Sequence, residues 1–346
     1  MNGLKGSFPV TFLAAATGGG VAWLAGVPVP FLLGAALATA AAAMAGVDTR
    51  LPEPVRIFAF FALGIQAGSG VTPAAMEQVW LWPASFAALF AAVTATIAVT
   101  FLYLTKARGW SRQTAFFASL PGALTFVLAA ARETDADYRA VTVLQTVRLF
   151  LIIGLIVPLI SVLKGGAAAV PEMPLPPDAV WQFGLLLAAG IAGALSGHFS
   201  RLPGGMMLGA LLSSALLFAG SAVNVRLPPA FANIGMIVLG IVIGSRFSGL
   251  GKCEIRQLFA ASFNAFALGT VASALIGYLL HLATGIGLSK IALAFVPGAM
   301  EAMTVISFVL GVDPAYVAAH HVMRFFFIAV SVPFIAKWLS QGKTDK

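Results

Sequence analysis

The chain has little charge and almost no cysteine. Only 9% of its 346 residues are charged, whereas 60% are hydrophobic, and a typical soluble domain carries about 25% charged residues. The single cysteine, Cys253, excludes an internal disulfide and a thiolate metal cluster. No basic stripe with interleaved aromatic residues is present, so the net charge of +8 does not indicate nucleic-acid binding.

Long uncharged runs take the place of the missing charge. Two of them, 81–104 and 258–280, exceed the roughly 18 apolar residues that indicate a membrane helix. The sequence therefore predicts an all-α polytopic membrane protein in contact with the lipid bilayer. In such a protein, Lys and Arg collect in cytoplasmic loops. The apolar run after Lys5 resembles a signal peptide, but we interpret it as a retained first helix because the second half contains its counterpart.

The chain contains one unit twice, with the copies about 175 residues apart. The matching positions include Arg50-Leu51-Pro52 with Arg226-Leu227-Pro228, Leu63-Gly64-Ile65 with Leu239-Gly240-Ile241, Pro121-Gly122-Ala123 with Pro297-Gly298-Ala299, and Asp137 and Arg148 with Asp313 and Arg324. We expect a first membrane repeat over 1–164, a linker rich in Pro and Gly over 165–178, and a second repeat over 179–346. The expected apolar segments are 8–25, 28–46, 55–70, 81–104, 114–131 and 138–163, then 180–197, 204–222, 230–245, 257–282, 288–310 and 315–338.

Loop charge bears on whether the repeats are parallel or inverted. If every segment crosses the membrane, the repeats are parallel, and the side opposite the N-terminus holds Arg132, Arg139, Arg201, Arg246, Lys252 and Arg256. If the Pro-Gly-Ala segment of each half enters and returns, the repeats are inverted, and the opposite side keeps only Lys164, Arg226 and Lys290. The second arrangement gives the stronger positive-inside bias. We therefore expect inverted repeats of about five crossings plus one broken or re-entrant segment each, about 10–12 segments in all, with both termini cytoplasmic.

The Pro-Gly-Ala stretches predict two broken helices in matching positions. Many secondary transporters bind substrate where short or Gly/Pro-interrupted helices of inverted repeats meet, and a half-helix N-terminus there favours anions. The alternative is that proline only kinks a continuous helix. Glu301, which follows the second stretch, is the one acid inside an apolar segment, and its repeat partner is Thr125. It either couples transport to a cation or contacts solute, or it forms a structural ion pair with Arg324 or Arg148.

Arg148 and Arg324 occupy equivalent positions in the last segment of each half. Gln145 and His321 precede them by three residues, which places each pair on one helical face. The arginines either reach the membrane interface or, if buried, hold an anionic substrate or the exposed carbonyls of the breaks. His321 is a candidate proton relay. The adjacent His320 points about 100° away on a helix, so the pair is a poor metal site.

The candidate substrate- or ion-binding set combines these positions with three polar residues near the Leu-Gly-Ile motifs, which either allow close helix packing or line a cavity. The full set is Pro121, Gly122, Ala123, Thr125, Gln145, Arg148, Pro297, Gly298, Ala299, Glu301, His321, Arg324, Gln66, Ser69 and Ser245. We expect no catalytic residues, no metal ligands and no cofactor. Self-association into a homo-oligomer is left open.

The paired motifs resemble those of the bacterial integral membrane AbrB duplication family. The second copy reads VPGAMEAM followed by DPAYVAAHHVMR, and the first reads LPGALTFV followed by DYRAVTVLQTVR. The family usually has Gly where Ala123 and Ala299 stand. The resemblance implies a bacterial inner-membrane protein whose relatives are labelled regulators of gene expression or ammonia monooxygenases and are suspected transporters. It implies no defined substrate, and it does not extend to the soluble DNA-binding regulator of the same name.

Secondary transport of a small anionic or zwitterionic solute by alternating access, with H⁺ or Na⁺ coupling, is the function that these features favour. A membrane-embedded sensor or regulator of gene expression is the main alternative. A passive channel and an ammonia oxidase are further alternatives. The sequence offers no set of residues for the metal cluster that an ammonia oxidase would need. We therefore expect a transporter and not an enzyme.

Overall fold

A computed structural model describes residues 8–71, 79–122, 124–132, 134–163, 179–200 and 204–341. The expected linker over 165–178 lies outside these residues. Throughout the described part, the regular elements are helices and no strand is present. Six of these helices are long and apolar enough to cross a membrane: Trp82–Ala107, Tyr138–Val162, Ala179–Phe199, Pro229–Phe247, Cys253–Thr284 and Pro314–Val332. The chain is thus an all-helical polytopic membrane protein, as its composition predicted.

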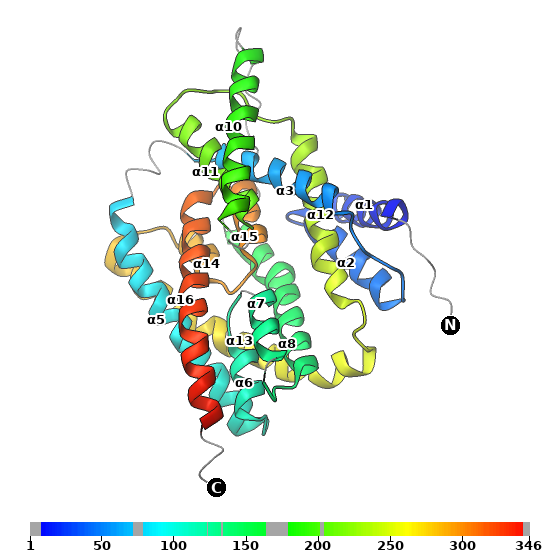
Figure 1. Cartoon of the computed structure of the whole chain (residues 1–346), viewed down its shortest axis with the longest axis vertical. Helices are drawn as coiled ribbons and strands as arrows, with labels where there is room; N and C mark the ends of the chain where they lie inside the picture. The colour runs from blue at the N-terminus through cyan, green and yellow to red at the C-terminus, as the bar shows by residue number, and fades with distance from the viewer. Residues whose placement is uncertain are drawn as a thin grey trace. The chain divides into compact units, whose positions relative to one another are not determined.

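The helices follow the expected apolar segments closely (Figure 1). The first half contains α1 (Phe8–Leu24), α2 (Pro30–Met44), α3 (Glu53–Gly68), the short turn η1 (Val79–Leu81), α5 (Trp82–Leu102), the π-helical turn η2 (Tyr103–Ala107), α6 (Arg112–Ser119), α7 (Leu124–Arg132), α8 (Tyr138–Leu151), the π-helical turn η3 (Ile152–Ile156) and α9 (Val157–Leu163). The second half contains α10 (Ala179–Phe199), α11 (Gly205–Ala219), α12 (Pro229–Gly244), the turn η4 (Ser245–Phe247), α13 (Lys252–Thr284), α14 (Leu288–Phe295), α15 (Met300–Val309) and α16 (Pro314–Gln341).

One boundary differs clearly from expectation. The segment expected over 257–282 begins at Lys252, so its first turn is polar. Glu254 explains this earlier start, because its Oε2 accepts a hydrogen bond from the backbone N–H of Gly251 at 3.1 Å. A carboxylate in the first turn satisfies a free amide and suits the positive end of the helix. The expected boundary rests on the apolar run alone, which does not include this polar turn.

The described helices form two compact units, and each unit draws on both halves of the chain. Unit 1 comprises Met1–Trp80, Val157–Leu250 and Glu301–Ala318. Unit 2 comprises Leu81–Ile156, Gly251–Met300 and Ala319–Lys346. The sequence repeat and the compact unit are therefore different divisions of the chain.

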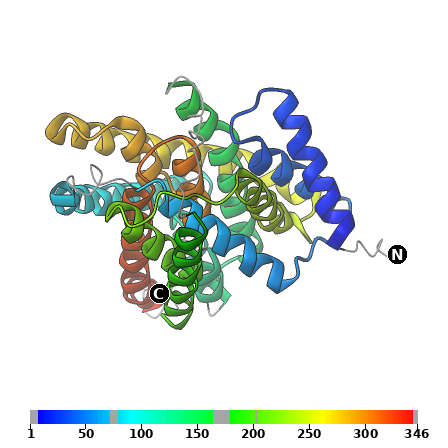
Figure 2. The same cartoon turned by 90° about the horizontal axis from the view of Figure 1, so that it is seen from above.

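Unit 1 is built by an exchange of helices between the halves. The first two helices of each half pack together, as α1 and α2 do in Figure 2, but α3 packs on α11 and α12 packs on α2. Glycines allow the close approach: a Cβ at Gly68 would lie 2.5 Å from the Leu211 carbonyl oxygen, and one at Gly244 would lie 2.6 Å from that of Ala36. Small residues at helix contacts are typical of membrane proteins.

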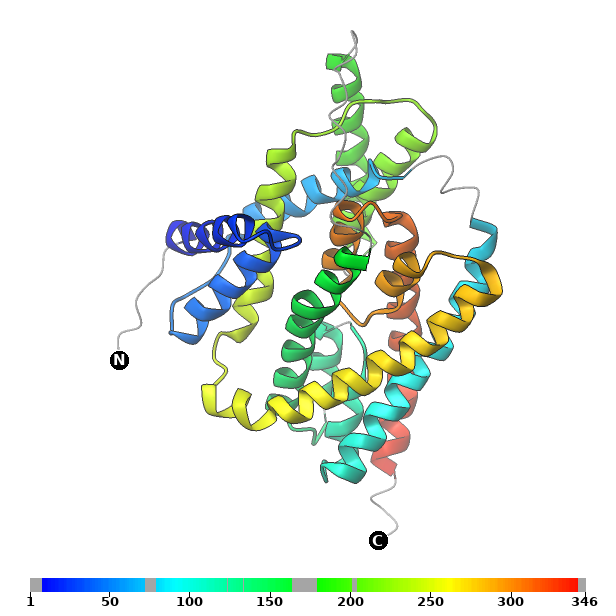
Figure 3. The ribbon, with the colours of Figure 1, turned by 180° about the vertical axis from the view of Figure 1, so that it is seen from behind.

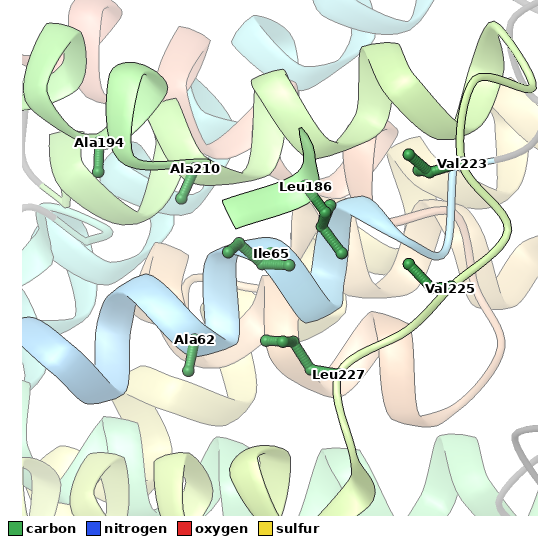
Figure 4. Close-up of a cluster of buried hydrophobic side chains, with 8 residues drawn as sticks. All are labelled: Ala62, Ile65, Leu186, Ala194, Ala210, Val223, Val225 and Leu227. Atoms are coloured by element: carbon green, nitrogen blue, oxygen red, sulfur yellow. The ribbon is translucent and has the colours of Figure 1, made fainter. Parts of the chain in front are cut away.

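A compact apolar cluster joins α3, α10, α11 and the segment before α12 (Figure 4). Ile65 and Leu186 are completely buried at its centre. The members are Ala62, Ile65, Leu186, Ala194, Ala210, Val223, Val225 and Leu227. Because the cluster mixes both halves, it stabilises the exchanged packing of unit 1.

Unit 2 is built on α5 and α13, which pack along one another (Figure 3). Two threonines of α5 connect them: Thr96 Oγ1 donates to the Gly269 carbonyl at 3.1 Å, and Thr100 Oγ1 donates to the Ala265 carbonyl at 3.4 Å. The shorter helices α6, α7 and α14 and the long helix α8 also belong to this unit, as does most of α16. Unit 2 therefore holds most of both predicted breaks.

Candidate functional site

Both predicted helix breaks are present. Residues 120–122 are non-helical and follow α6 before α7 begins at Leu124, and residues 296–299 separate α14 from α15. Leu120 and Val296, which directly precede the prolines, have extended backbone. A proline disfavours the helical conformation of the residue directly before it, and so ends the helix there. The prediction of two broken segments is confirmed, and each break leaves the last carbonyls of its first half-helix without intrahelical donors.

Gln145 and Arg148 of α8 cap the end of α6. Gln145 Nε2 donates to the carbonyl oxygens of Phe117 at 3.1 Å and Leu120 at 3.0 Å. Arg148 Nη1 donates to the Leu120 carbonyl at 3.0 Å, and its Nη2 donates to Gln145 Oε1. Both side chains are buried. The amide and the guanidinium together satisfy the Phe117 and Leu120 carbonyls at the first break.

His321 and Arg324 of α16 cap the end of α14 in the same way. His321 Nε2 lies 3.1 Å from the Leu293 carbonyl oxygen, and its Nδ1 contacts Nη2 of Arg324. Arg324 Nη1 donates to the Val296 carbonyl at 2.7 Å, and Nη2 donates to the Gly298 carbonyl at 2.9 Å. Leu293 and Val296 are the repeat partners of Phe117 and Leu120, so the two networks match except in two bonds. Gln145 also donates to Leu120, which His321 does not match at Val296, and Arg324 also donates to Gly298.

The capping helices also begin alike. Asp137 precedes α8, and its Oδ1 accepts from the backbone amides two and three residues later, both at 3.0 Å. Asp313 precedes α16 and accepts from the equivalent amides at 3.0 and 3.1 Å. An N-cap aspartate fixes where a helix starts. The matched starts therefore place the glutamine–arginine and histidine–arginine pairs at equivalent positions along their helices.

Arg324 lies against the first break as well as the second. Gly122 has a left-handed backbone with φ of 83°, and a Cβ there would lie 3.4 Å from both Nε and Nη2 of Arg324. Gly298, its repeat partner, does not share this left-handed conformation. Glycine adopts positive φ without steric cost. Gly122 thus turns the chain and leaves room for the guanidinium.

The centre of unit 2 carries excess positive charge. Arg148 and Arg324 are only 6% and 3% exposed. Arg148 contacts the Leu120 carbonyl and Arg324 lies against Gly122, two residues further along, so we expect their like charges to repel. The negative ends of α6 and α14 offset part of this charge. In the described part of unit 2, the ion pair joins Arg139 to Glu254 at 3.4 Å and involves neither buried arginine. Burying a cation costs several kcal/mol unless a counter-charge is present.

The other predicted positions at the breaks are placed as follows. Pro121, Pro297 and Gly298 are buried, and Ala299 is half-buried. Thr125 belongs to the first turn of α7. Ala123 lies outside the described residues. The structure therefore brings the predicted glutamine, histidine and both arginines together at the breaks in unit 2.

Glu301 lies in the first turn of α15, in unit 1, and is half-buried. Its carboxylate is near enough to the guanidinium of Arg246, which follows α12 in the same unit, for a favourable electrostatic interaction, but no ion pair within 4.0 Å joins these two described residues. From the sequence, Arg246 is a loop residue, so its proximity to Glu301 was not predicted. Its place directly after Gly244 and Ser245, in the repeated Leu-Gly-Ile segment, was an available signal. The expected pairing of Glu301 with a residue of unit 2 stays a prediction.

Gln66, Ser69 and Ser245 also belong to unit 1. The serine hydroxyls donate to carbonyls one turn back, Ser69 to Gln66 at 2.7 Å and Ser245 to Val242 at 3.0 Å. These bonds belong to the helix ends. Gln66 is 5% exposed, and its Oε1 has no hydrogen-bond partner among the described residues.

The adjacent histidines have different partners. His320 Nε2 lies 2.7 Å from Ser85 Oγ, and its ring packs against Phe86 with centroids 4.6 Å apart. His321 instead faces the second break. Across the described residues, no group of three or more His, Cys, Asp or Glu side chains is placed to hold a metal ion. The two rings therefore have different hydrogen-bond partners.

Comparison with known proteins identifies the family. A family model described as "Transition state regulatory protein AbrB" matches residues 31–340. The Escherichia coli (strain K12) protein named "Putative regulator AbrB" is 26% identical over 318 residues, which cover 90% of each chain. The Bacillus subtilis (strain 168) protein named "Uncharacterized protein YhjN" is 27% identical over 244 residues, 64% of this chain and 62% of the relative. The chain belongs to the AbrB family, as its paired motifs predicted.

Proposed function

We propose that the protein is a secondary transporter that moves a small anionic or zwitterionic solute across the bacterial inner membrane. The observation that carries this proposal is the pair of buried guanidinium groups of Arg148 and Arg324, each of which contacts a carbonyl at a broken helix. An anion or the carboxylate of a zwitterion would neutralise this charge. Arginine presents a planar set of donors that suits carboxylate and phosphate. The proposal assigns no enzymatic reaction to the chain.

The fold supports alternating access as the mechanism. Alternating access moves one compact body against another around a site at broken helices, and this chain folds as two compact units that each contain parts of both repeats. Glu301, paired electrostatically with Arg246 in unit 1, is the proposed coupling residue for H⁺ or Na⁺. Inverted repeats with both termini in the cytoplasm belong to the same proposal.

Flux into proteoliposomes tests the proposal. We expect saturable, gradient-dependent accumulation of a carboxylate, phosphate or amino acid, and no accumulation of matched cations. Arg148→Gln should reduce this flux at least roughly tenfold, since it removes an interaction of the size expected for a charged hydrogen bond. Arg139→Gln is the matched control, because Arg139 is exposed and pairs with Glu254 outside the breaks. Equal loss in both variants, or equal flux of cations, would contradict an anion site at the arginines.

A sensor or regulator of gene expression is a second candidate function. It is favoured by the printed names of the family model and of the Escherichia coli relative, both of which contain the word regulator or regulatory. Deletion of the protein should then change transcription, and arginine variants that still fold should restore it. If the transcriptional effect instead depends on the transported solute, those variants should fail to restore it.

A further inference from the structure

The two capping networks differ in one chemical group. Where the first network has the amide of Gln145, the second has the imidazole of His321. Both side chains contact a carbonyl of the preceding half-helix and the arginine one turn later. An amide stays neutral at all physiological pH values, whereas histidine changes charge between about pH 5 and pH 8. The substitution therefore makes one of two equivalent networks titratable.

The partners of His321 define its tautomer. A guanidinium has donors and no acceptor, so Nδ1 must use its lone pair to accept from Nη2 of Arg324. The Leu293 carbonyl only accepts, so Nε2 must carry the hydrogen of the 3.1 Å contact. Gln145 shows the same polarity, with Nε2 donating and Oε1 accepting. The capped network consequently contains neutral His321 with its hydrogen on Nε2.

We propose that Nδ1 of His321 is a proton-binding site of the transport cycle and that its protonation releases Arg324 from the second helix break. A proton from water forms an N–H bond with the Nδ1 lone pair, and the imidazole gains one positive charge. Arg324 Nη2 then loses its acceptor and faces a like charge. The Val296 and Gly298 carbonyls lose the donor that joins them. Gln145 cannot bind a proton, so the first break stays capped.

The surrounding charges connect this proton to an anion. The charged or titratable groups that act on His321 are Arg324 on its own helix and the neighbouring His320. From α8, Arg148 acts on Arg324. The facing part of α14 supplies the Leu293 carbonyl. Since these side chains are basic, a bound anion would favour protonation, and protonation would favour the anion by the same factor. The inference rests on the proposed transport function and specifies it as movement of an anion together with a proton.

Nitrogen-15 NMR of the full-length protein in lipid nanodiscs tests the site without any variant. The chain contains only four histidines, so selective labelling gives few signals. We expect one histidine with its hydrogen on Nε2 at about pH 8, assigned by its loss in His321→Gln. Because its neighbours are basic, it should become doubly protonated at a lower pH than the other histidines, and acetate should move this protonation to higher pH. A His321 signal that stays neutral on acidification both with and without acetate would overturn the proposal.

Hydrogen–deuterium exchange then tests the consequence, with the first break as an internal reference. Exchange of the amides of residues 296 and 298–300, relative to those of 120 and 122–124, should rise roughly tenfold on acidification, the equivalent of about 1.4 kcal/mol. His321→Gln should rebuild the Gln145 geometry and abolish the rise, and Gln145→His should make the first break pH-dependent. A constant ratio in the wild type, or an unchanged rise in His321→Gln, would refute the switch. Both measurements are independent of solute flux, so they can fail while transport is observed, or succeed while it is not.

Discussion

Arg324 Nη1 donates a 2.7 Å hydrogen bond to the carbonyl oxygen of Val296, the residue that precedes the proline of the second break. Arg148 makes the equivalent bond to Leu120 at 3.0 Å in the first break. The same guanidinium groups that hold the broken helices therefore supply the positive charge of the candidate site. A ligand that engages either arginine must alter how firmly its break is held, and this links binding to conformation.

The two arginines should show repulsive coupling in a double-mutant cycle. Arg148→Met and Arg324→Met each remove donors from buried carbonyls, and an unsatisfied buried group costs about 1–3 kcal/mol. We expect the larger loss for Arg324, because Leu120 keeps a second donor in Gln145. Each single variant also relieves the repulsion, which the double variant can relieve only once. The double variant should therefore lose more stability than the sum, by about 0.5–3 kcal/mol.

Reversible unfolding in mixed detergent micelles measures these four stabilities. Val147→Ala on α8 is a control for a buried change that does not touch the guanidinium groups. Additive losses would show that Arg148 and Arg324 do not sense each other. A double variant more stable than the sum would indicate attraction through an intervening anion instead of repulsion.

Gly122→Ala should combine backbone strain with a functional defect. A left-handed conformation costs a non-glycine residue about 1–2 kcal/mol, and the new Cβ would lie 3.4 Å from two nitrogens of Arg324. Gly109→Ala is a matched control, because Gly109 is also left-handed at φ of 68° but has open space around it. Both variants should lose similar thermal stability in detergent. Only Gly122→Ala should also change anion flux, and equal flux in the two would separate Gly122 from the site.

The sequence predicted this region well because its signals are local. Proline and glycine mark a break wherever they interrupt an apolar helix, and duplication of the Pro-Gly stretch made the signal specific. Spacing of three residues placed Gln145 with Arg148 and His321 with Arg324. The sequence left open whether the arginines hold substrate or the carbonyls of the breaks. The structure shows the carbonyl contacts directly, and binding of a solute stays a prediction.

Close helix packing in unit 1 predicts a strong contrast between two glycines of α10. A Cβ at Gly193 would lie 2.2 Å from the Gly209 carbonyl oxygen of α11, a distance that forces the helices apart. Gly184 has no neighbouring atom within 4 Å of its Cβ position. Gly193→Ala should destabilise the fold by about 1–3 kcal/mol through overpacking, whereas Gly184→Ala should be neutral or stabilising by up to about 1 kcal/mol. Thermal unfolding in detergent compares them, and similar midpoints would contradict the packing.

Relations between distant parts of the chain were beyond the sequence. The exchange of α3 onto α11 and α12 onto α2 depends on which small faces meet, and each face is locally compatible with several partners. The proximity of Glu301 to Arg246 could not be predicted for the same reason, because the two residues lie on different helical segments and no helical spacing relates them. Hydropathy also placed the start of α13 too late, because the Glu254 cap is polar.

Single-cysteine labelling should distinguish inverted from parallel repeats. After Cys253→Ser, cysteines that replace Lys106, Arg139 or Lys290 can be modified by an impermeant reagent in intact cells or inverted vesicles. Inverted repeats place 106 and 139 on the cytoplasmic face and 290 on the opposite face, because the broken segments do not cross. Parallel repeats place 106 with 290, opposite 139. The grouping of the labels thus decides between the two arrangements.

In a double-mutant cycle, Glu301 and Arg246 should show attractive coupling, opposite in sign to the repulsive coupling expected between Arg148 and Arg324. Glu301→Gln and Arg246→Gln each break one favourable electrostatic interaction, and the double variant breaks it only once, so its loss of stability should be smaller than the sum by about 0.5–3 kcal/mol. If Glu301 also carries the coupling ion, Glu301→Gln should retain solute exchange between equal pools but lose accumulation driven by an ion gradient. Arg56→Gln, in an exposed pair with Glu53, is the control. Full accumulation by Glu301→Gln, together with the expected stability coupling, would assign Glu301 a purely structural role. Additive stability losses would show that Glu301 and Arg246 do not interact.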